Sequence, residues 1–253
     1  MLQENLIGLI PAAGEASRLG LPFPKELYPT IKNNRFIPVS NYVVDDLLLA
    51  GVKHLVFVIN ETKHQLIGYY GSGQRYNCHF SYVVQENVSV SQSTSPGLAN
   101  ALASAYHLIK GKIVLFGMPD TIMRPKNVFK LGLSMIEAEN DIVLCLFPTE
   151  YPENFGMVVT SNEGSVEKII DKPKKTDLKY MWGCIIWTPA FSDFLNTQVH
   201  TNNVSDFADI LNQATKSSFS VKSICFPEGK FIDFGTYDQI SQFFENPDFI
   251  ENR

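Results

Sequence analysis

Residues 6–20 read LIGLIPAAGEASRLG, a continuously apolar run that passes at once into small residues. Leu6 to Pro11 has the length and the unbroken hydrophobicity of a strand buried on both faces of a sheet. The turn Ala12-Ala13-Gly14 directly after it predicts a loop that leaves the sheet with an accessible backbone. This stretch predicts an α/β fold that begins with a buried parallel strand.

Strand-like and helix-like segments alternate from this stretch to about residue 147. The predicted strands are 54–59, 80–84, 112–116 and 141–147, and the predicted helices are 40–50, 61–70, 97–109 and 126–138. Glycines at positions 51 and 71 follow two of these helices and end them. Because strands that alternate with helices are joined by right-handed crossovers, we expect a mostly parallel sheet.

The second half of the chain has a different pattern. Runs at 156–160, 166–171 and 181–188 resemble strands without intervening helices, which predicts antiparallel pairs. Helices at 189–195 and 204–215, strands at 219–225 and 231–234, and a helix from Thr236 complete the prediction. We therefore expect a single domain over residues 1–253, with a central mixed, mostly parallel sheet flanked by helices and a small antiparallel lobe.

Composition excludes several classes of partner. The 253 residues are 45% hydrophobic, and 21 Lys and Arg stand against 26 Asp and Glu, for a net charge of -5. An acidic chain repels polyanions, so we expect neither a nucleic-acid nor an acidic-membrane partner. A phosphate ligand would then need local cations, a metal ion or backbone amides.

Targeting signals and cysteines point to one compartment. The first residues lack the basic start and apolar core of a signal peptide, and no apolar run approaches the roughly 20 residues of a membrane helix. The four cysteines, at positions 78, 145, 184 and 225, form no C-x-x-C pair and are predicted to be buried thiols. A cytoplasmic location is the expectation.

The loop after the first strand carries two cations. Arg18 and Lys25 flank Pro22 and Pro24, which stiffen the segment between them. Small residues let backbone N–H groups approach a phosphate, and the two cations neutralise it. The segment therefore predicts a phosphate site.

These motifs resemble the sugar-1-phosphate nucleotidylyltransferases, the family of glucose-1-phosphate thymidylyltransferase and UDP-glucose pyrophosphorylase. The opening loop ends in Arg18 and is followed by Pro24-Lys25. The later fragments, in the family's order, are Gln85, Pro96-Gly97-Leu98-Ala99, Phe116-Gly117-Met118-Pro119-Asp120, Phe155-Gly156-Met157-Val158-Val159, Asp171-Lys172-Pro173, Trp182-Gly183-Cys184-Ile185-Ile186 and Phe231-Ile232-Asp233-Phe234-Gly235-Thr236. The resemblance covers nearly the whole chain and implies the family's Rossmann-like nucleotidyltransferase fold.

The resemblance also implies an activity. Such an enzyme transfers a nucleoside monophosphate from a nucleoside triphosphate, here dTTP or UTP, to a sugar 1-phosphate and releases pyrophosphate. Residues 1–150 would mainly bind the nucleotide and residues 151–253 mainly the sugar phosphate. Relatives commonly assemble as dimers or tetramers, so a homo-oligomer is a further expectation.

The resemblance assigns site residues one by one. Arg18, Lys25, Asp120 and Asp233 would be catalytic, with Asp120 and Asp233 holding Mg²⁺. The expected nucleotide-binding residues are Ala12, Ala13, Gly14, Glu15, Arg18, Lys25, Gln85, Gly97 and Asp120, and the expected sugar-phosphate-binding residues are Gly156, Asp171, Lys172 and Gly183. The physical need agrees, because Mg²⁺ between carboxylates and phosphate oxygens stabilises charge during phosphoryl transfer.

Departures from the family pattern leave alternatives open. The short interval from Arg18 to Lys25 is more like the small cytidylyltransferases of isoprenoid synthesis, so CTP with a sugar or polyol phosphate is one alternative. Ala13 and Ala16 stand where glycines are usual, and a non-catalytic relative that binds a nucleotide-sugar is another. Asp171 stands where the family usually has Glu. A dinucleotide-dependent oxidoreductase is disfavoured because the first loop lacks the G-x-G-x-x-G spacing.

Overall fold

The first strand lies inside a parallel sheet, as its apolar run predicts. The structure is a computed structural model that describes residues 5–14, 19–32, 34–86 and 97–245. Every residue of β1 (Leu6–Pro11) is buried. It pairs in parallel with β4 (His54–Ile59) and β6 (Ile113–Gly117), and β5 (His79–Val84) extends the sheet beside β4. The carboxyl ends of these strands therefore meet at one edge.

The antiparallel half continues the same sheet. β11 (Tyr180–Trp187) runs antiparallel to β6 and to β8 (Ile142–Pro148), and β12 (Val221–Cys225) pairs in parallel with β8. β9 (Gly156–Thr160) and β10 (Val166–Asp171) form an antiparallel pair beyond β11. The principal strand order is β10-β9-β11-β6-β1-β4-β5. The predicted mixed, mostly parallel sheet with antiparallel strands in the second half is confirmed.

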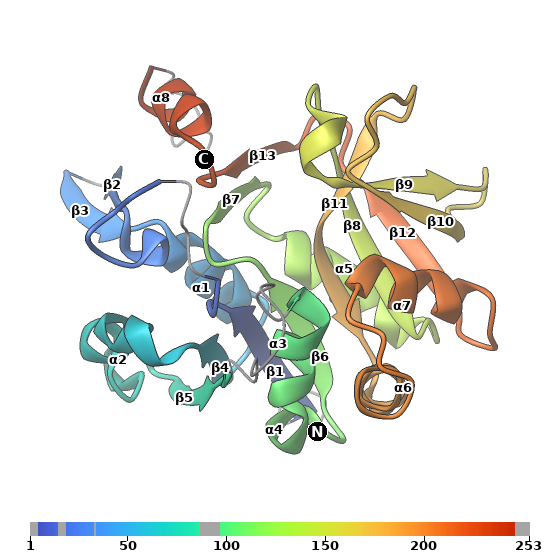
Figure 1. The fold of residues 1–253 in the computed structure, drawn as a ribbon, viewed down its shortest axis with the longest axis horizontal. Helices are drawn as coiled ribbons and strands as arrows, with labels where there is room; N and C mark the ends of the chain where they lie inside the picture. The colour runs from blue at the N-terminus through green and yellow to red at the C-terminus, as the bar shows by residue number, and fades with distance from the viewer. Residues whose placement is uncertain (1–4, 15–18, 33, 87–96, 246–253) are drawn as a thin grey trace.

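Helices cover both faces of the sheet (Figure 1). Alternate residues of β1 belong to the two opposite cores. Ile7 and Leu9 join the core shared with one helix group, whereas Leu6 and Ile10 join the opposite core. The first group is α3 (Leu98–Ser104), α4 (Tyr106–Ile109), α6 (Pro189–His200) and α7 (Phe207–Thr215); the second is α1 (Ser40–Leu49), α2 (His64–Tyr70) and α5 (Val128–Glu137). The central strands β1, β4 and β6 thus have two buried faces.

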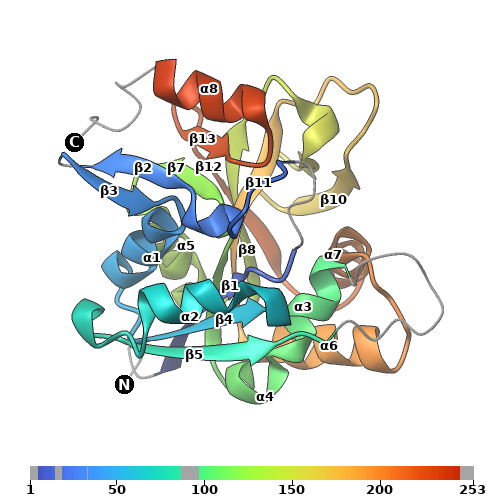
Figure 2. The same cartoon turned by 60° about the vertical axis from the view of Figure 1, so that its left-hand side comes forward.

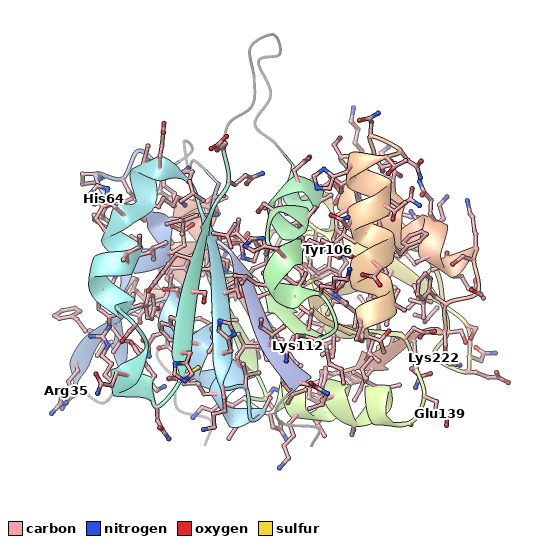
Figure 3. The ribbon with its side chains drawn as sticks, turned by 90° about the horizontal axis from the view of Figure 1, so that it is seen from below. Arg35, His64, Tyr106, Lys112, Glu139 and Lys222 are labelled. Carbon is pink, nitrogen blue, oxygen red and sulfur yellow. The ribbon has the colours of Figure 1, made fainter. Side chains whose placement is uncertain are left out.

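Side-chain contacts tie neighbouring helices of the first group together. Tyr106, labelled in Figure 3, lies between α4 and α6, and its hydroxyl donates to Asp193 Oδ1 over 2.7 Å. The predicted helix at 97–109 is interrupted at Ala105, where α3 ends and α4 begins. This pair of short helices replaces the single continuous helix that apolar spacing predicts.

Two short ribbons and a helix lie above the sheet (Figure 2). The helix from Thr236 and the strand at 231–234 were predicted, whereas the other three strands of the ribbons were not. β2 (Pro29–Lys32) pairs with β3 (Arg35–Pro38), and β7 (Thr121–Arg124) pairs with β13 (Lys230–Asp233), both antiparallel. α8 (Tyr237–Glu245) packs there around buried Phe234, Ile240 and Phe243. Four-residue strands carry too little periodicity to be recognised without their partners.

The prediction that every cysteine is a buried thiol is wrong at one position. Cys78, Cys145 and Cys184 are buried, whereas Cys225 at the end of β12 is exposed. The apolar run that contains Cys225 is β12, which pairs with β8 at the margin of the sheet and is buried only at its first residue. Within the described residues, no helix is both long and apolar enough to cross a bilayer.

A buried carboxyl group in α1 makes stability depend on pH. Asp46 is 4% exposed and Oδ2 has no hydrogen-bond partner among the described residues. Burial raises the pKa of Asp46 to about 8, although Arg124 opposes the shift. The folded protein therefore retains a proton that the unfolded chain loses near its ordinary pKa of 3.8. Its contribution to stability is fully present below that pKa and is lost as pH rises towards 8.

Replacing Asp46 with asparagine is expected to remove this loss. Relative to the variant, the wild type should lose a few kcal/mol of unfolding free energy between pH 5 and pH 8, on the order of 1 kcal/mol per pH unit. Urea unfolding at several pH values measures the difference. The matched control is Asp177→Asn at an exposed carboxylate, which should keep the wild-type pH dependence. An equal pH dependence in wild type and Asp46→Asn contradicts the assignment.

Candidate functional site

The first loop is anchored at the edge where the parallel strands end. The Ala12 amide donates to the Val58 carbonyl over 2.6 Å, and Asn60 Nδ2 donates to the Ala13 carbonyl over 2.8 Å. Gly14 is exposed, and a Cβ there would have no heavy atom within 4 Å. Protein packing therefore does not require this glycine, and open space lies beside it. Glu15 and Arg18 lie outside the described residues.

The ribbon of β7 and β13 brings two distant carboxylates together. Asp120 immediately precedes β7, and Asp233 ends β13 as the register partner of Thr121. The amide of Phe234 donates to the Asp120 carbonyl over 2.8 Å. Asp120 thus lies one residue before the register partner of Asp233, and both residues line one pocket. The ribbon was not predicted, and a metal ion shared by Asp120 and Asp233 stays a prediction.

Lys25 lies against these carboxylates. Its Nζ donates to Asp120 Oδ2, and Asp120 is only 3% exposed. Burial alone would lower the pKa of Lys25, but the attraction and hydrogen bond of Asp120 outweigh it, and Asp233 adds to the attraction, so the pKa is raised. Asp120 Oδ1 is buried without a hydrogen-bond partner among the described residues. A buried carboxylate oxygen of this kind is suited to a further cationic partner.

Buried hydrogen bonds to Glu26 hold the turn that carries Lys25 in place. Glu26, 1% exposed, accepts a hydrogen bond from Lys63 Nζ at 2.5 Å, and the Ser40 hydroxyl donates to the Glu26 carbonyl over 2.6 Å. Burial raises the pKa of Glu26 and lowers that of Lys63, against their mutual attraction. Charges therefore alternate in sign from Lys63 through Glu26 and Lys25 to Asp120.

Replacing Lys63 with methionine is expected to destabilise the fold, because it leaves Glu26 buried without a cation. The expected loss is about 3–5 kcal/mol of unfolding free energy, whereas the double variant Glu26→Met, Lys63→Met should recover most of it. Denaturant unfolding of both singles and the double gives the coupling free energy. If the double variant loses the sum of the single losses, the pair is not coupled and the expectation is wrong.

An open pocket of about 390 Å³ extends from Lys25 and the two carboxylates towards β9, β10 and α7. Its lining residues are Lys25, Gly97, Leu98, Met118, Asp120, Thr121, Asn154, Phe155, Gly156, Asp171, Lys172, Trp182, Gly183, Ser205, Asp206, Phe207, Ala208, Phe231, Asp233 and Gly235. All four residues predicted for the sugar phosphate are among them, together with Lys25, Gly97 and both carboxylates. Residues from both halves of the chain thus form one pocket.

Glycines allow aromatic side chains to line this pocket. We call its aromatic lining residues the aromatic wall: Phe155, Trp182, Phe207 and Phe231. A Cβ on Gly156 would lie 2.3 Å from Trp182 Nε1, and a Cβ on Gly183 would lie 2.7 Å from the ring of Phe147. The indole of Trp182 therefore packs directly on the backbone of β9. Its other ring neighbours are Phe116 and Phe207. Packing against these rings therefore accounts for both glycines. Their role is to let the aromatic side chains take their positions, and no direct contact with a ligand is needed to explain them.

A cation stands at the outer end of the pocket. Lys172 Nζ lies 3.8 Å from Asp171 Oδ2, and the Lys172 side chain is 63% exposed. The Lys172 backbone has φ of 45°, and its amide donates to the Phe155 carbonyl over 3.0 Å. Non-glycine residues seldom adopt this conformation, and they do so disproportionately at ligand sites. The exposed amine is available to an incoming anion.

Other predicted residues lie at the same sheet edge without lining this pocket. Within the described part of the chain, the lining does not include Ala12, Ala13, Gly14 or Gln85. Gln85 follows β5, is 8% exposed, and its Nε2 has no hydrogen-bond partner among the described residues. An unsatisfied buried amide commonly marks a place where a partner is missing.

Some lining residues were not predicted. Trp182 stands within a quoted fragment but received no role, and Asn154 precedes another. Asp206 stands immediately before α7, where an acidic residue reads as an ordinary helix cap. Only its place beside the end of β10 distinguishes it, and that place depends on tertiary structure.

The fold and the site together define an α/β protein of Rossmann-like type with a polar ligand pocket outside the carboxyl ends of its strands. The family pattern described as Nucleotidyl transferase matches residues 7–248. The chain belongs to this family, as its motifs predicted. Membership leaves the oxidoreductase alternative without support.

Relatives agree with this membership. The chain is 26% identical over 193 residues to the low-salt glycan biosynthesis nucleotidyltransferase Agl11 of Haloferax volcanii, covering 74% of this chain and 50% of that protein. It thus spans about half the length of that relative. It is 24% identical to a candidate UTP–glucose-1-phosphate uridylyltransferase of Bacillus subtilis, over 91% of this chain and 90% of the relative.

Solved structures share the fold. A candidate glucose-1-phosphate thymidylyltransferase from Bacillus anthracis, in complex with sucrose, superposes with a TM-score of 0.82 at 18% identity, over 98% of this chain and 96% of that one. A UDP-glucose pyrophosphorylase complexed with UDP-glucose superposes with a TM-score of 0.77 at 21% identity, over 98% and 99% of the two chains. The predicted Rossmann-like fold is confirmed.

Proposed function

We propose that this protein transfers a nucleoside monophosphate from dTTP or UTP to a sugar 1-phosphate, with release of pyrophosphate. A phosphate oxygen of the sugar attacks the α-phosphorus in line, and the bond from that phosphorus to the bridging oxygen of pyrophosphate breaks. The observation that carries the proposal is the convergence of Lys25, Asp120 and Asp233 on one pocket. Resemblance to named nucleotidyltransferases supports it.

Mg²⁺ is the cofactor that fits the carboxylates. Asp120 and Asp233 would hold it, since Mg²⁺ takes one or two carboxylates and completes its shell with substrate oxygens and water. The unpartnered buried oxygen of Asp120 is consistent with this role. When bound, the ion neutralises phosphate charge that develops during the transfer.

Each of two lysines would bind the phosphate of a different substrate. Lys25 would contact the triphosphate and Lys172 the phosphate of the sugar, with Arg18, outside the described residues, orienting the pyrophosphate. Residues 1–150 would then bind mainly the nucleotide, through the first loop, Gln85 and Gly97. Residues 151–253 would bind mainly the sugar phosphate, through Asp171 and the aromatic wall.

A pyrophosphate-release screen tests the proposal. Five nucleoside triphosphates, each with Mg²⁺, are combined with a panel of sugar 1-phosphates and polyol phosphates. Turnover of dTTP or UTP with a sugar 1-phosphate is the expected result. CTP turnover with a sugar or polyol phosphate would instead identify a cytidylyltransferase, and nucleotide binding by calorimetry without turnover would identify a non-catalytic relative.

The same proposal includes a cytoplasmic protein that assembles as a homo-oligomer. Sedimentation of the purified chain at several concentrations tests the assembly. A dimer or tetramer is expected, and a monomer throughout the concentration range contradicts that part of the proposal.

A further inference from the structure

Asp206 is held rigidly at the start of α7. Its Oδ1 accepts hydrogen bonds from the amides of Ala208 at 2.7 Å and Asp209 at 3.2 Å. Within the described residues, its other oxygen has no hydrogen-bond partner. The side chain lines the pocket proposed to hold the sugar phosphate. The helix cap therefore leaves one carboxylate oxygen available in a fixed position.

The packing of α7 on β10 places Asp206 near the end of that strand. Asn212 bonds both backbone groups of Ile169, at 2.7 and 2.8 Å, and Thr215 Oγ1 donates to the Glu167 carbonyl at 3.5 Å. The helix and the strand therefore run in opposite directions, and the start of α7 lies towards Asp171, the last residue of β10. Asp206 and Asp171 consequently line the same end of the pocket.

Asp206 differs in its charge balance from two other carboxylates of the pocket. Asp120 has Lys25 beside it and Asp171 has Lys172 at 3.8 Å, whereas no described cation forms an ion pair with Asp206. Trp182 supplies an aromatic face at the same end. An aromatic face with hydrogen-bond acceptors around it suits the apolar face and the hydroxyls of a sugar ring.

We propose that Asp206 is a specificity-determining residue that accepts a hydrogen bond from a hydroxyl of the sugar and rejects sugar 1-phosphates whose ring bears a carboxylate. The inference rests on the proposed function, because it assumes that this end of the pocket holds the sugar. A sugar carboxylate would meet an unpaired like charge and could not donate to it, which is the repulsive element that specificity commonly uses. A hydroxyl meets no such repulsion and can donate a hydrogen bond to the Asp206 carboxylate.

The variant Asp206→Asn separates charge from structure, because asparagine caps helices about as well as aspartate. The kcat/KM values for glucose 1-phosphate and glucuronic acid 1-phosphate are measured with the preferred triphosphate. We expect the wild type to prefer glucose 1-phosphate about tenfold or more, the effect of a repulsion between charges that interact partly through solvent. The variant should lose most of that preference, because asparagine carries no charge. Asp209, in the first turn of α7, is also an exposed aspartate. Its variant Asp209→Asn is the matched control and should keep the wild-type ratio of the two kcat/KM values.

Salt dependence distinguishes charge repulsion from a change of shape. Raising the ionic strength should weaken the preference of the wild type and leave that of Asp206→Asn nearly unchanged. A wild type that uses both sugars equally, or an Asp206→Asn variant with the wild-type ratio, overturns the inference while the proposed function stands.

A direct binding measurement keeps the two proposals separate. If no triphosphate is turned over, the proposed function fails, and calorimetry with glucose 1-phosphate and glucuronic acid 1-phosphate still tests Asp206. Weaker binding of the glucuronic acid compound, relieved in Asp206→Asn but not in Asp209→Asn, supports the inference. Equal affinities of the wild type for the two compounds, or no binding of either, contradict it.

Discussion

Replacing Asp120 with asparagine is expected to lower kcat/KM for pyrophosphate release by roughly 10³-fold, because a lost metal ligand removes several kcal/mol of charge stabilisation. Asparagine preserves the size of the side chain, so its buried position at the turn before β7 is retained. The loss should appear mainly in kcat, since the charge that it stabilises develops during the transfer. Steady-state kinetics at saturating Mg²⁺ measures it.

The role of the carboxylate pair can also be read without turnover. Mg²⁺ should raise the melting temperature of the wild type, and less so in Asp120→Asn and Asp233→Asn, because a ligand that binds only the folded state stabilises it. Asp238→Asn, an exposed carboxylate close to Asp233 in α8, is the control and should respond as the wild type does. An Asp120→Asn variant with at least half the wild-type activity would rule out the assignment.

Much of the fold follows from local patterns in the sequence. The apolar run of β1 is buried completely, and the alternation of strands and helices predicts the parallel half correctly. The strands of the second half, which lack intervening helices, pair antiparallel as expected. These features depend on the burial of whole segments, and a burial pattern is visible in a single sequence.

The ribbon of β7 and β13 could not be predicted in the same way. Thr121-Ile122-Met123-Arg124 has no strand signature of its own, and its partner lies more than one hundred positions further along the chain. The convergence of Asp120 and Asp233 was inferred from family resemblance, whereas its cause is this long-range pairing. Residues that act through tertiary placement, such as Asp206, give no local signal that separates them from helix caps.

Glycines illustrate the same limit. Gly14 and Gly156 both stand in quoted motifs, but the structure separates them by their surroundings. Gly14 faces open space, as a backbone that approaches a ligand requires, whereas Gly156 is required by the indole of Trp182. A sequence alone contains the glycine but not the neighbour that explains it.

Replacing Lys25 with methionine is expected to lower kcat/KM by about 10²- to 10³-fold, the usual effect of removing one electrostatic contact to a transition state. Methionine retains most of the apolar stem, so the loss reports the charge rather than packing. Lys25→Arg should recover part of the activity because it restores the charge, but not all, since the guanidinium is larger and planar. Kinetics of the three proteins with the same pair of substrates measures the ranking.

The pH dependence gives a second, independent reading of Lys25. Its pKa lies above its ordinary value of 10.5, because Asp120 and its hydrogen bond outweigh the effect of burial. The lysine therefore remains charged in the free enzyme throughout the neutral and mildly alkaline range, and kcat/KM should show no alkaline decline below about pH 10 from this group. A decline that occurs near pH 8 in the wild type and is absent in Lys25→Arg would mean that the amine loses its proton there. In that case Lys25 could not act as the fixed positive charge that the proposed reaction requires, because half of the enzyme would lack that charge at pH 8.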